Sequence, residues 1–201
     1  MTTALARNQA ARRRRVLDAT LSLAVSGGFD AVQMRDVAQE ADVALGTVYR
    51  YFSSKERLLL EANIEQINGL ARRLEQRPPE GDSASERVKD VLRRANRTLL
   101  KRREVTTAMV RALASSPPSE ADAVRQITVT MTGIITSAIC PEPPADQDLV
   151  TARILQQVWL SALVGWVGGV DPAERVHEDL DLAVDALVLD GSVYSAVYGA
   201  V

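Results

Sequence analysis

Residues 32–52, VQMRDVAQEADVALGTVYRYF, contain two short stretches in which apolar residues recur at helical spacing. We predict short helices over residues 34–41 and 45–51, joined by a tight connection. A longer helix is expected before them, over residues 8–25, ending at the glycine pair 27–28. A long helix followed by two short ones is typical of a helix-turn-helix, whose second short helix enters the DNA major groove.

A small aliphatic core is predicted to fix the angle between the two short helices. It consists of Val37, Ala38, Val43 and Val48. The side chains that remain for solvent or DNA are Arg35, Thr47, Tyr49 and Arg50. Alanine and glycine at positions 44 and 46 would let the second helix approach the groove closely.

The rest of the chain also shows helical spacing between breakers, with no alternating run of strand length. Ser53 with Glu56 and Ser83 with Glu86 have the spacing of a capping box. We expect Asp171 to cap the last helix, which ends before residue 191. The other predicted helices are 53–76, 83–101, 105–114, 120–139 and 147–167. The predicted fold class is all-α.

Charge is distributed unevenly along the 201 residues, whose formal net charge is −2. Residues 1–57 hold nine Lys and Arg against six Asp and Glu, whereas the remainder holds fifteen against twenty. This asymmetry suits a small module held against phosphates and a larger one kept away from them. We predict a helix-turn-helix DNA-binding domain over 1–55, a ligand-binding and dimerisation bundle over 56–191, and a tail over 192–201.

Several other classes of protein are disfavoured by the composition. Cys140 and His177 are the chain's one cysteine and one histidine, which leaves no metal constellation, internal disulfide or Cys/His catalytic pair. No Gly-rich phosphate loop appears either, so an enzyme is the weaker alternative and no cofactor is expected. The apolar run 154–170 is short for a membrane span and contains Gln156 and Gln157. Without a secretion signal, we expect a cytoplasmic protein that has no membrane partner.

Residues 43–52, followed by Ser53-Ser54-Lys55-Glu56, resemble the signature of the TetR family of transcriptional regulators. The resemblance covers residues 12–60 and implies a repressor that binds palindromic operator DNA as a homodimer. Lys55 is similar to the lysine that opens the fourth helix, where its ammonium and the helix N-terminus together favour a phosphate. Gln33 departs from the hydroxyl residue that commonly caps the second helix in this family. The DNA contacts that the resemblance implies are Gln33, Arg35, Thr47, Tyr49, Arg50, Tyr51 and Lys55.

Arginines 12–15 form a separate basic run on the first helix. Such a run is either an ordinary solvated helix face or a set of phosphate contacts that strengthen binding without reading the sequence. We take Arg14 as the candidate phosphate contact.

The last two helices are apolar over a wide arc, which fits either a monomer core or a four-helix interface built from two helices per chain. DNA geometry favours the dimer, because two half-sites about one turn apart require two recognition helices.

An apolar effector is expected in the C-terminal bundle. Segments 31–35, 41–44 and 158–166 resemble the KstR-type repressors of sterol catabolism, which implies a lipid-like effector such as a steroid or lipid coenzyme A thioester. Arg111 and Arg125 are candidate partners for its phosphates. The candidate ligand-binding residues are Ile67, Met109, Met131, Trp159, Leu163 and Trp166, although a Met or Trp at helical spacing more often belongs to the core than to the wall of a ligand site.

The mechanism expected is that the effector re-angles the helix over 53–76, which bridges the two domains, and so changes the separation of the recognition helices. The effector must then bind the DNA-incompetent state more tightly. The alternative is an architectural DNA-binding protein that has no small-molecule ligand.

Overall fold

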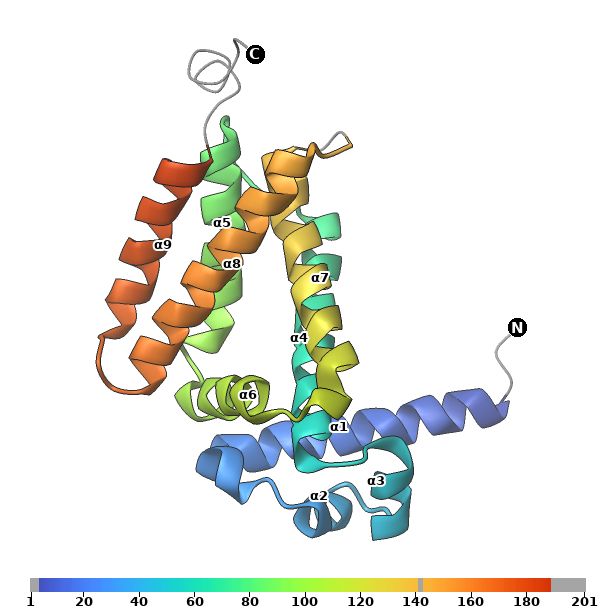
Figure 1. Ribbon diagram of the computed structural model, residues 1–201. Helices are drawn as coiled ribbons and strands as arrows, with labels where there is room; N and C mark the ends of the chain where they lie inside the picture. The colour runs from blue at the N-terminus through green and yellow to red at the C-terminus, as the bar shows by residue number, and fades with distance from the viewer. Residues whose placement is uncertain (1–3, 141–142, 189–201) are drawn as a thin grey trace. The chain divides into compact units, whose positions relative to one another are not determined.

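A computed structural model describes residues 4–140 and 143–188, and within these ranges every element is helical (Figure 1). The predicted all-α fold is therefore confirmed. The predicted tail over 192–201 lies outside the described residues. The elements are α1 (Ala4–Ala31), α2 (Met34–Glu40), α3 (Leu45–Tyr51), α4 (Lys55–Gln76), α5 (Ala84–Leu99), α6 (Arg103–Ser115), the 3-10 helix η1 (Pro118–Glu120), α7 (Ala121–Ile139), α8 (Asp146–Val167) and α9 (Ala173–Leu187).

The regular backbone of α1 ends at the predicted glycine pair, although one more helical turn carries the helix to Ala31. Gly28 has φ +65° and ψ −150°, a conformation that is essentially restricted to glycine. A Cβ at this position would also lie 3.2 Å from the Glu104 carboxylate of α6. Glycine at position 28 is therefore needed for the backbone angle, and it also leaves room for the Glu104 side chain.

The capping predictions had different outcomes. The Ser83–Glu86 box is confirmed: Ser83 Oγ accepts from the Glu86 N–H at 3.1 Å, and the Glu86 carboxylate accepts from the Ser83 N–H at 3.2 Å. The box predicted at Ser53 is wrong, because α4 begins two residues later and Ser54 Oγ accepts from the Arg57 N–H at 3.0 Å.

The last helix also begins differently from the prediction. Pro172 occupies the N-cap position of α9, and no side chain caps it. The Asp171 carboxylate instead lies against Gly165 of α8, where a Cβ would overlap it. Asp171 is therefore not the cap of α9.

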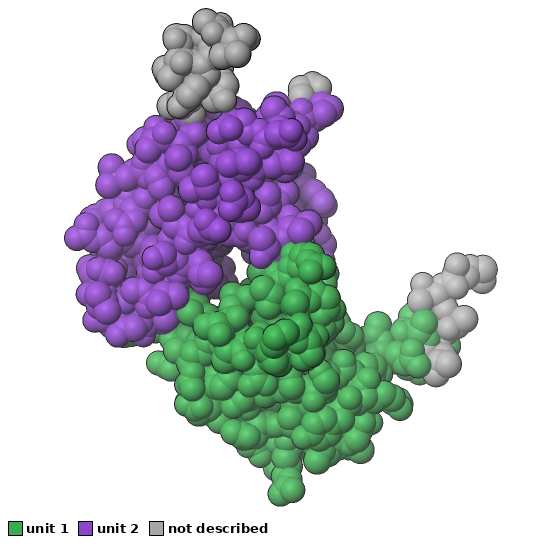
Figure 2. All heavy atoms as spheres, in the orientation of Figure 1, with its two compact units in different colours: residues 1–66, 102–127 green, residues 67–101, 128–201 purple. Residues whose placement is uncertain are grey.

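The described residues up to Gln66, together with Arg102–Ile127, form one compact unit, called the N-terminal unit (Figure 2, green). In it, α1 packs against α6 and α2, and α2 packs against α3. Its core is aliphatic and aromatic, and its largest fully buried side chains include Leu17, Val32, Val37, Val48, Phe52, Leu58 and Leu59.

The second compact unit, called the C-terminal unit, consists of Ile67–Lys101 and the described residues from Thr128 (Figure 2, purple). Here α9 packs against both α8 and α5. Ion pairs from Lys89 to Asp185 and from Arg93 to Asp181 join α5 to α9. The Arg87 guanidinium donates to the carbonyls of Ala138 and Ile139, in the last turn of α7, where carbonyls have no partner within the helix.

Both α4 and α7 have residues in each compact unit. The units describe packing, so the functional division into 1–55 and 56–191 stays a prediction. Of the helices in the described ranges, none combines the length and the apolar character that crossing a bilayer requires.

Candidate nucleic-acid interface

The turn between α2 and α3 is closed by backbone hydrogen bonds. The Val43 N–H donates to the Ala38 carbonyl at 3.0 Å, and Asp42, at φ +52°, lies in the left-handed region that aspartate tolerates better than most residues. The Thr47 N–H donates to the Ala44 carbonyl at 2.8 Å and so begins α3. The sequence 38–47 thus fixes the angle of α3 without a side-chain cap.

One face of each short helix is buried, as predicted. Val37 and Val48 are fully buried, Ala38 is 4% exposed, and Val43 packs against this core while remaining partly exposed. Phe52, which directly follows α3, is also buried. These contacts hold α3 rigidly on one side and leave its other side to solvent.

The predicted DNA-contacting residues on α2 and α3 are mostly on this open side. Arg35, Tyr49 and Arg50 are exposed, and Thr47 is half-buried. Gln33 occupies the N-cap position of α2 but does not cap it, because its side-chain amide donates to the Asp30 carbonyl at 2.9 Å.

Tyr51 differs from its neighbours on α3. Its ring packs against the core, with its centroid 6.2 Å from that of Phe52, and the Arg50 guanidinium lies over it at 5.4 Å. Its hydroxyl is buried and has no hydrogen-bond partner among the described residues. In this conformation Tyr51 supports α3 from inside.

Lys55 is the first residue of α4 and is half-buried against the end of α1. Its Nζ donates to the Phe29 carbonyl at 3.3 Å and lies 4.0 Å from the centroid of the Phe29 ring. The Arg111 guanidinium of α6 lies over the same ring at 4.5 Å. Phe29 therefore holds two cations at the end of α1.

Arg111 also forms an ion pair with Asp30 at 2.8 Å. The hydrogen bond from Arg111 lowers the pKa of Asp30 against the opposing effect of burial, and the charges of Arg111 and Lys55 lower it further. The sequence made Arg111 a candidate partner for the phosphates of the effector. In the structure its partner is Asp30, within the N-terminal unit. Arg125, the other candidate, is exposed on α7.

The arginine run on α1 divides into exposed and engaged side chains. Arg14 is exposed and pairs with Asp18 one turn along the helix, at 3.2 Å. Arg13 turns inward, pairs with Glu61 and lies over the Phe52 ring. The Arg15 Nε donates to the Ala41 carbonyl at 3.2 Å, which ties α1 to the turn after α2.

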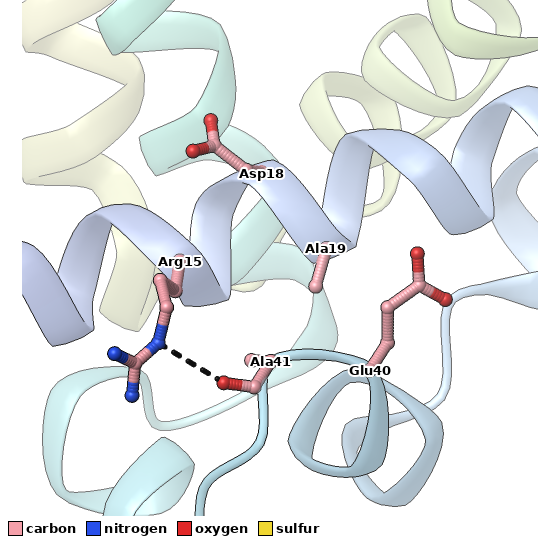
Figure 3. A pocket seen from close by; sticks show the side chains of 5 residues that line it. All are labelled: Arg15, Asp18, Ala19, Glu40 and Ala41. Atoms are coloured by element: carbon pink, nitrogen blue, oxygen red, sulfur yellow. Dashed lines mark hydrogen bonds between the residues drawn. The ribbon is translucent and has the colours of Figure 1, made fainter.

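This last hydrogen bond crosses a shallow hollow between α1 and the end of α2 (Figure 3). The residues that line the hollow are Arg15, Asp18, Ala19, Glu40 and Ala41.

Sequence reasoning missed an ion-pair cluster centred on Arg57. Its guanidinium pairs with Glu61 at 2.8 Å, with Glu120 at 3.2 Å and with Asp122 at 3.1 Å. Burial opposes the charged form, but these hydrogen bonds outweigh it and raise the pKa of Arg57 above its ordinary value. Ser53 Oγ donates to the buried Glu120 carboxylate at 3.0 Å, which explains why Ser53 does not cap α4.

The candidate ligand-binding residues are distributed over both units. Met109, on α6, is buried in the core of the N-terminal unit. Met131, on α7, is buried in the C-terminal unit, and Ile67, on α4, is half-buried there. The remaining candidates are Trp159, Leu163 and Trp166, which are buried on one face of α8.

Asn96, on α5, is a polar neighbour that the sequence did not reveal. It is fully buried, and its Oδ1 accepts a hydrogen bond from Trp159 Nε1 at 2.7 Å. A buried polar contact between α5 and α8 has no local sequence signal.

In the described part of the chain, no group of three or more His, Cys, Asp or Glu side chains could hold a metal ion.

Helices α1, α2 and α3 have the arrangement of a helix-turn-helix: one face of α3 is buried against the core, and its other face exposes polar side chains. This arrangement defines the class of DNA-binding regulators. Residues 16–62 match the family described as "Bacterial regulatory proteins, tetR family", and residues 81–187 match "Tetracyclin repressor-like, C-terminal domain". The chain belongs to the TetR family of transcriptional regulators.

Three of the proteins similar to this chain indicate where it stands in the family. The HTH-type transcriptional repressor KstR of Rhodococcus jostii is 40% identical over 92% of this chain and 86% of its own length. The crystal structure of a TetR transcriptional regulator from Rhodococcus sp. RHA1 has a TM-score of 0.84 at 30% identity, over 92% of this chain and 99% of that one. The structure of Thermus thermophilus FadR, a TetR-family repressor in complex with lauroyl-CoA, has a TM-score of 0.71 at 22% identity, over 88% and 93%.

Proposed function

We propose that this protein is a ligand-responsive transcriptional repressor that binds palindromic operator DNA as a homodimer and is released by an apolar effector. The observation that carries the proposal is the exposed polar face of α3 on a buried core. The relative at 40% identity is named a transcriptional repressor, which supports the same role here. The protein acts by binding rather than by catalysis, and its place of action is the cytoplasm.

The DNA contacts are of two kinds. Arg35, at the start of α2, reads a base edge, because a guanidinium can donate twice to guanine. The recognition helix contributes Thr47, Tyr49 and Arg50, whereas Tyr51, the fourth residue expected from the sequence, supports α3 from inside in this conformation. Lys55 and Arg14 contact phosphates. Gln33, at the N-cap position of α2, contacts the DNA next to Arg35.

Homodimerisation uses the outer faces of α8 and α9. Leu149, Leu160 and Val164 fall within one narrow arc of α8 and are 42%, 42% and 49% exposed. Leu182 on α9 is 68% exposed. Large apolar side chains gathered in this way mark an interaction surface, and a second copy supplies the second recognition helix that a palindrome requires.

The effector is a lipid-like molecule, such as a steroid or lipid coenzyme A thioester. The resemblance to KstR-type repressors and the lauroyl-CoA complex of the FadR relative support this class. Its candidate contacts are Ile67, Met109, Met131, Trp159, Leu163 and Trp166. The effector re-angles α4, which contributes residues to both compact units, and it binds the DNA-incompetent state more tightly.

Release of DNA by such molecules tests the proposal. Duplexes bound by the purified protein would be selected from random sequence and labelled, and lauroyl-CoA and cholestanoyl-CoA would be titrated into the complex. We expect a fall in fluorescence anisotropy as DNA is released. Free coenzyme A, which lacks the apolar part, is the control and should leave the complex intact. Indifference to every thioester would favour an architectural DNA-binding protein.

A further inference from the structure

Three buried polar side-chain atoms lack a hydrogen-bond partner among the residues that the structure describes. They are the Tyr51 hydroxyl, the Thr136 hydroxyl and Nδ2 of Asn96. Asn96 differs from the other two because its residue is fully buried while its other polar atom, Oδ1, is firmly held by Trp159.

The orientation of the Asn96 amide is set by chemistry. An indole N–H can only donate, so the atom that faces Trp159 must be the amide oxygen. The –NH₂ group must then point elsewhere, with two N–H donors to satisfy. The Thr136 hydroxyl, by contrast, can turn about its C–O bond.

Asn96 is the one polar side chain among the buried residues of α5. The other buried residues on α5 are Val88, Val91, Leu92 and Ala95. A buried donor without a partner costs folding free energy, and native proteins rarely keep one without a reason. The partner that would satisfy it must be a neutral acceptor, because burying an anion here would require a cation beside it.

We propose that Asn96 is the polar anchor of the effector site, where its –NH₂ group donates a hydrogen bond to a carbonyl oxygen of an otherwise apolar effector. This inference rests on the proposed function. It adds that the effector must contain a carbonyl oxygen that accepts a hydrogen bond from Asn96. Trp159 has two roles: its ring is a candidate wall of the site, and its N–H holds the amide oxygen, so that the –NH₂ group points away from the indole nitrogen. The carbonyl belongs either to a thioester or to a ring ketone.

Two pairs of probes separate these sources. Lauroyl-CoA and dodecyl-CoA thioether differ only in the carbonyl oxygen of the thioester. A cholestanone and cholestane differ in the same way at a ring ketone. Dissociation constants for each probe would be measured by calorimetry, and release of operator DNA would be measured in parallel.

The variants are designed so that the protein still folds. Asn96→Leu alone would leave the Trp159 N–H buried without a partner, whereas Asn96→Leu combined with Trp159→Phe removes both polar ends of the contact and leaves neither of them unpaired. Trp159→Phe alone is the matched control, because it trims the same ring and keeps the amide donors. Operator binding confirms that each variant is folded.

We expect the wild-type protein to bind the carbonyl member of one pair about tenfold more tightly than its partner. The ratio should be reduced in Trp159→Phe, where the amide keeps its donors but loses the N–H that orients it, and it should fall to about one in the double variant. A ratio near one for both pairs in the wild-type protein would overturn the inference while leaving the proposed function intact. A ratio that survives in the double variant would also overturn it. If none of the four probes releases operator DNA, both the proposed function and the inference fail.

Discussion

Individual side chains of the candidate DNA interface differ in how far their neighbours hold them. Arg35, Tyr49 and Arg50 project into solvent from helices whose opposite faces are buried. Lys55 is held between the Phe29 carbonyl and the Phe29 ring, so its ammonium is already oriented before DNA arrives. Base reading and phosphate binding should therefore respond differently to substitution.

Arg35→Ala should relax base preference at one position, at a cost of about 1–3 kcal/mol for the preferred base. Lys55→Ala should instead weaken binding to all sequences alike and reduce the slope of log K against log salt concentration by about one. Anisotropy titrations on matched and mismatched duplexes over a range of salt concentrations measure both effects. Arg93→Ala, which removes an exposed ion pair in the C-terminal unit, is the control. The assignment of the interface would be wrong if neither substitution altered binding.

The second prediction at this scale concerns Gly28. Gly28→Ala should lower the free energy of unfolding by about 1–3 kcal/mol, because its backbone conformation is strained for any residue with a Cβ. Gly133→Ala is the matched control: it is exposed on α7 with open space around it, and it should be neutral or stabilise by up to about 1 kcal/mol. Thermal or denaturant unfolding would show the difference. Equal effects at the two positions would argue against a special role for Gly28.

At the scale of the elements, the start of α4 is fixed by a side-chain cap and by several ion pairs. Ser54 caps it, and Arg57 ties its first turns to η1 and to the start of α7 through Glu120 and Asp122. Arg13 of α1 reaches Glu61 on the same helix. Since α4 is the proposed route from effector to DNA, these contacts define its position in the described state.

Arg57→Met should destabilise the protein by about 2–3 kcal/mol, because it leaves the buried Glu120 carboxylate without a cation. Adding Glu120→Gln should recover part of that loss, since the uncompensated charge is then gone. Arg14→Met removes a similar pair one turn apart on an exposed face and should change stability by less than about 0.5 kcal/mol. Denaturant unfolding of the four proteins provides the test. The cluster would have no special role if Arg57→Met proved as mild as Arg14→Met.

Local sequence features predicted the helices well, because helical spacing, glycine pairs and proline breakers act within a few residues. The helix-turn-helix core at Val37 and Val48 was visible for the same reason. Ser53 was misassigned because Glu120, 67 positions away, takes its hydroxyl. The Asn96–Trp159 contact, 63 positions apart, was invisible for the same kind of reason. Features that depend on long-range packing leave no local pattern to read.

For the whole molecule, the proposed dimer depends on the exposed apolar side chains of α8 and α9. A monomeric regulator would have no evident reason to expose Leu160 and Val164 side by side on one helix. A second copy would cover them and bring a second recognition helix to the operator.

Leu160→Glu should therefore convert the dimer to a monomer and weaken operator binding at least tenfold, because a carboxylate in an apolar interface is costly to bury. Sedimentation velocity and anisotropy measure the two effects. Val129→Glu is the control: Val129 is 63% exposed on α7, outside the proposed interface, and this variant should remain dimeric. A Leu160→Glu protein that stays dimeric would place the interface elsewhere.

Selection of bound duplexes from a random-sequence pool, read by sequencing, tests the central claim most directly. The account predicts an enriched inverted repeat, with half-sites whose centres lie about one helical turn or a small multiple apart. Selection of unrelated sequences, or of a single asymmetric site, would contradict a dimeric operator-binding repressor.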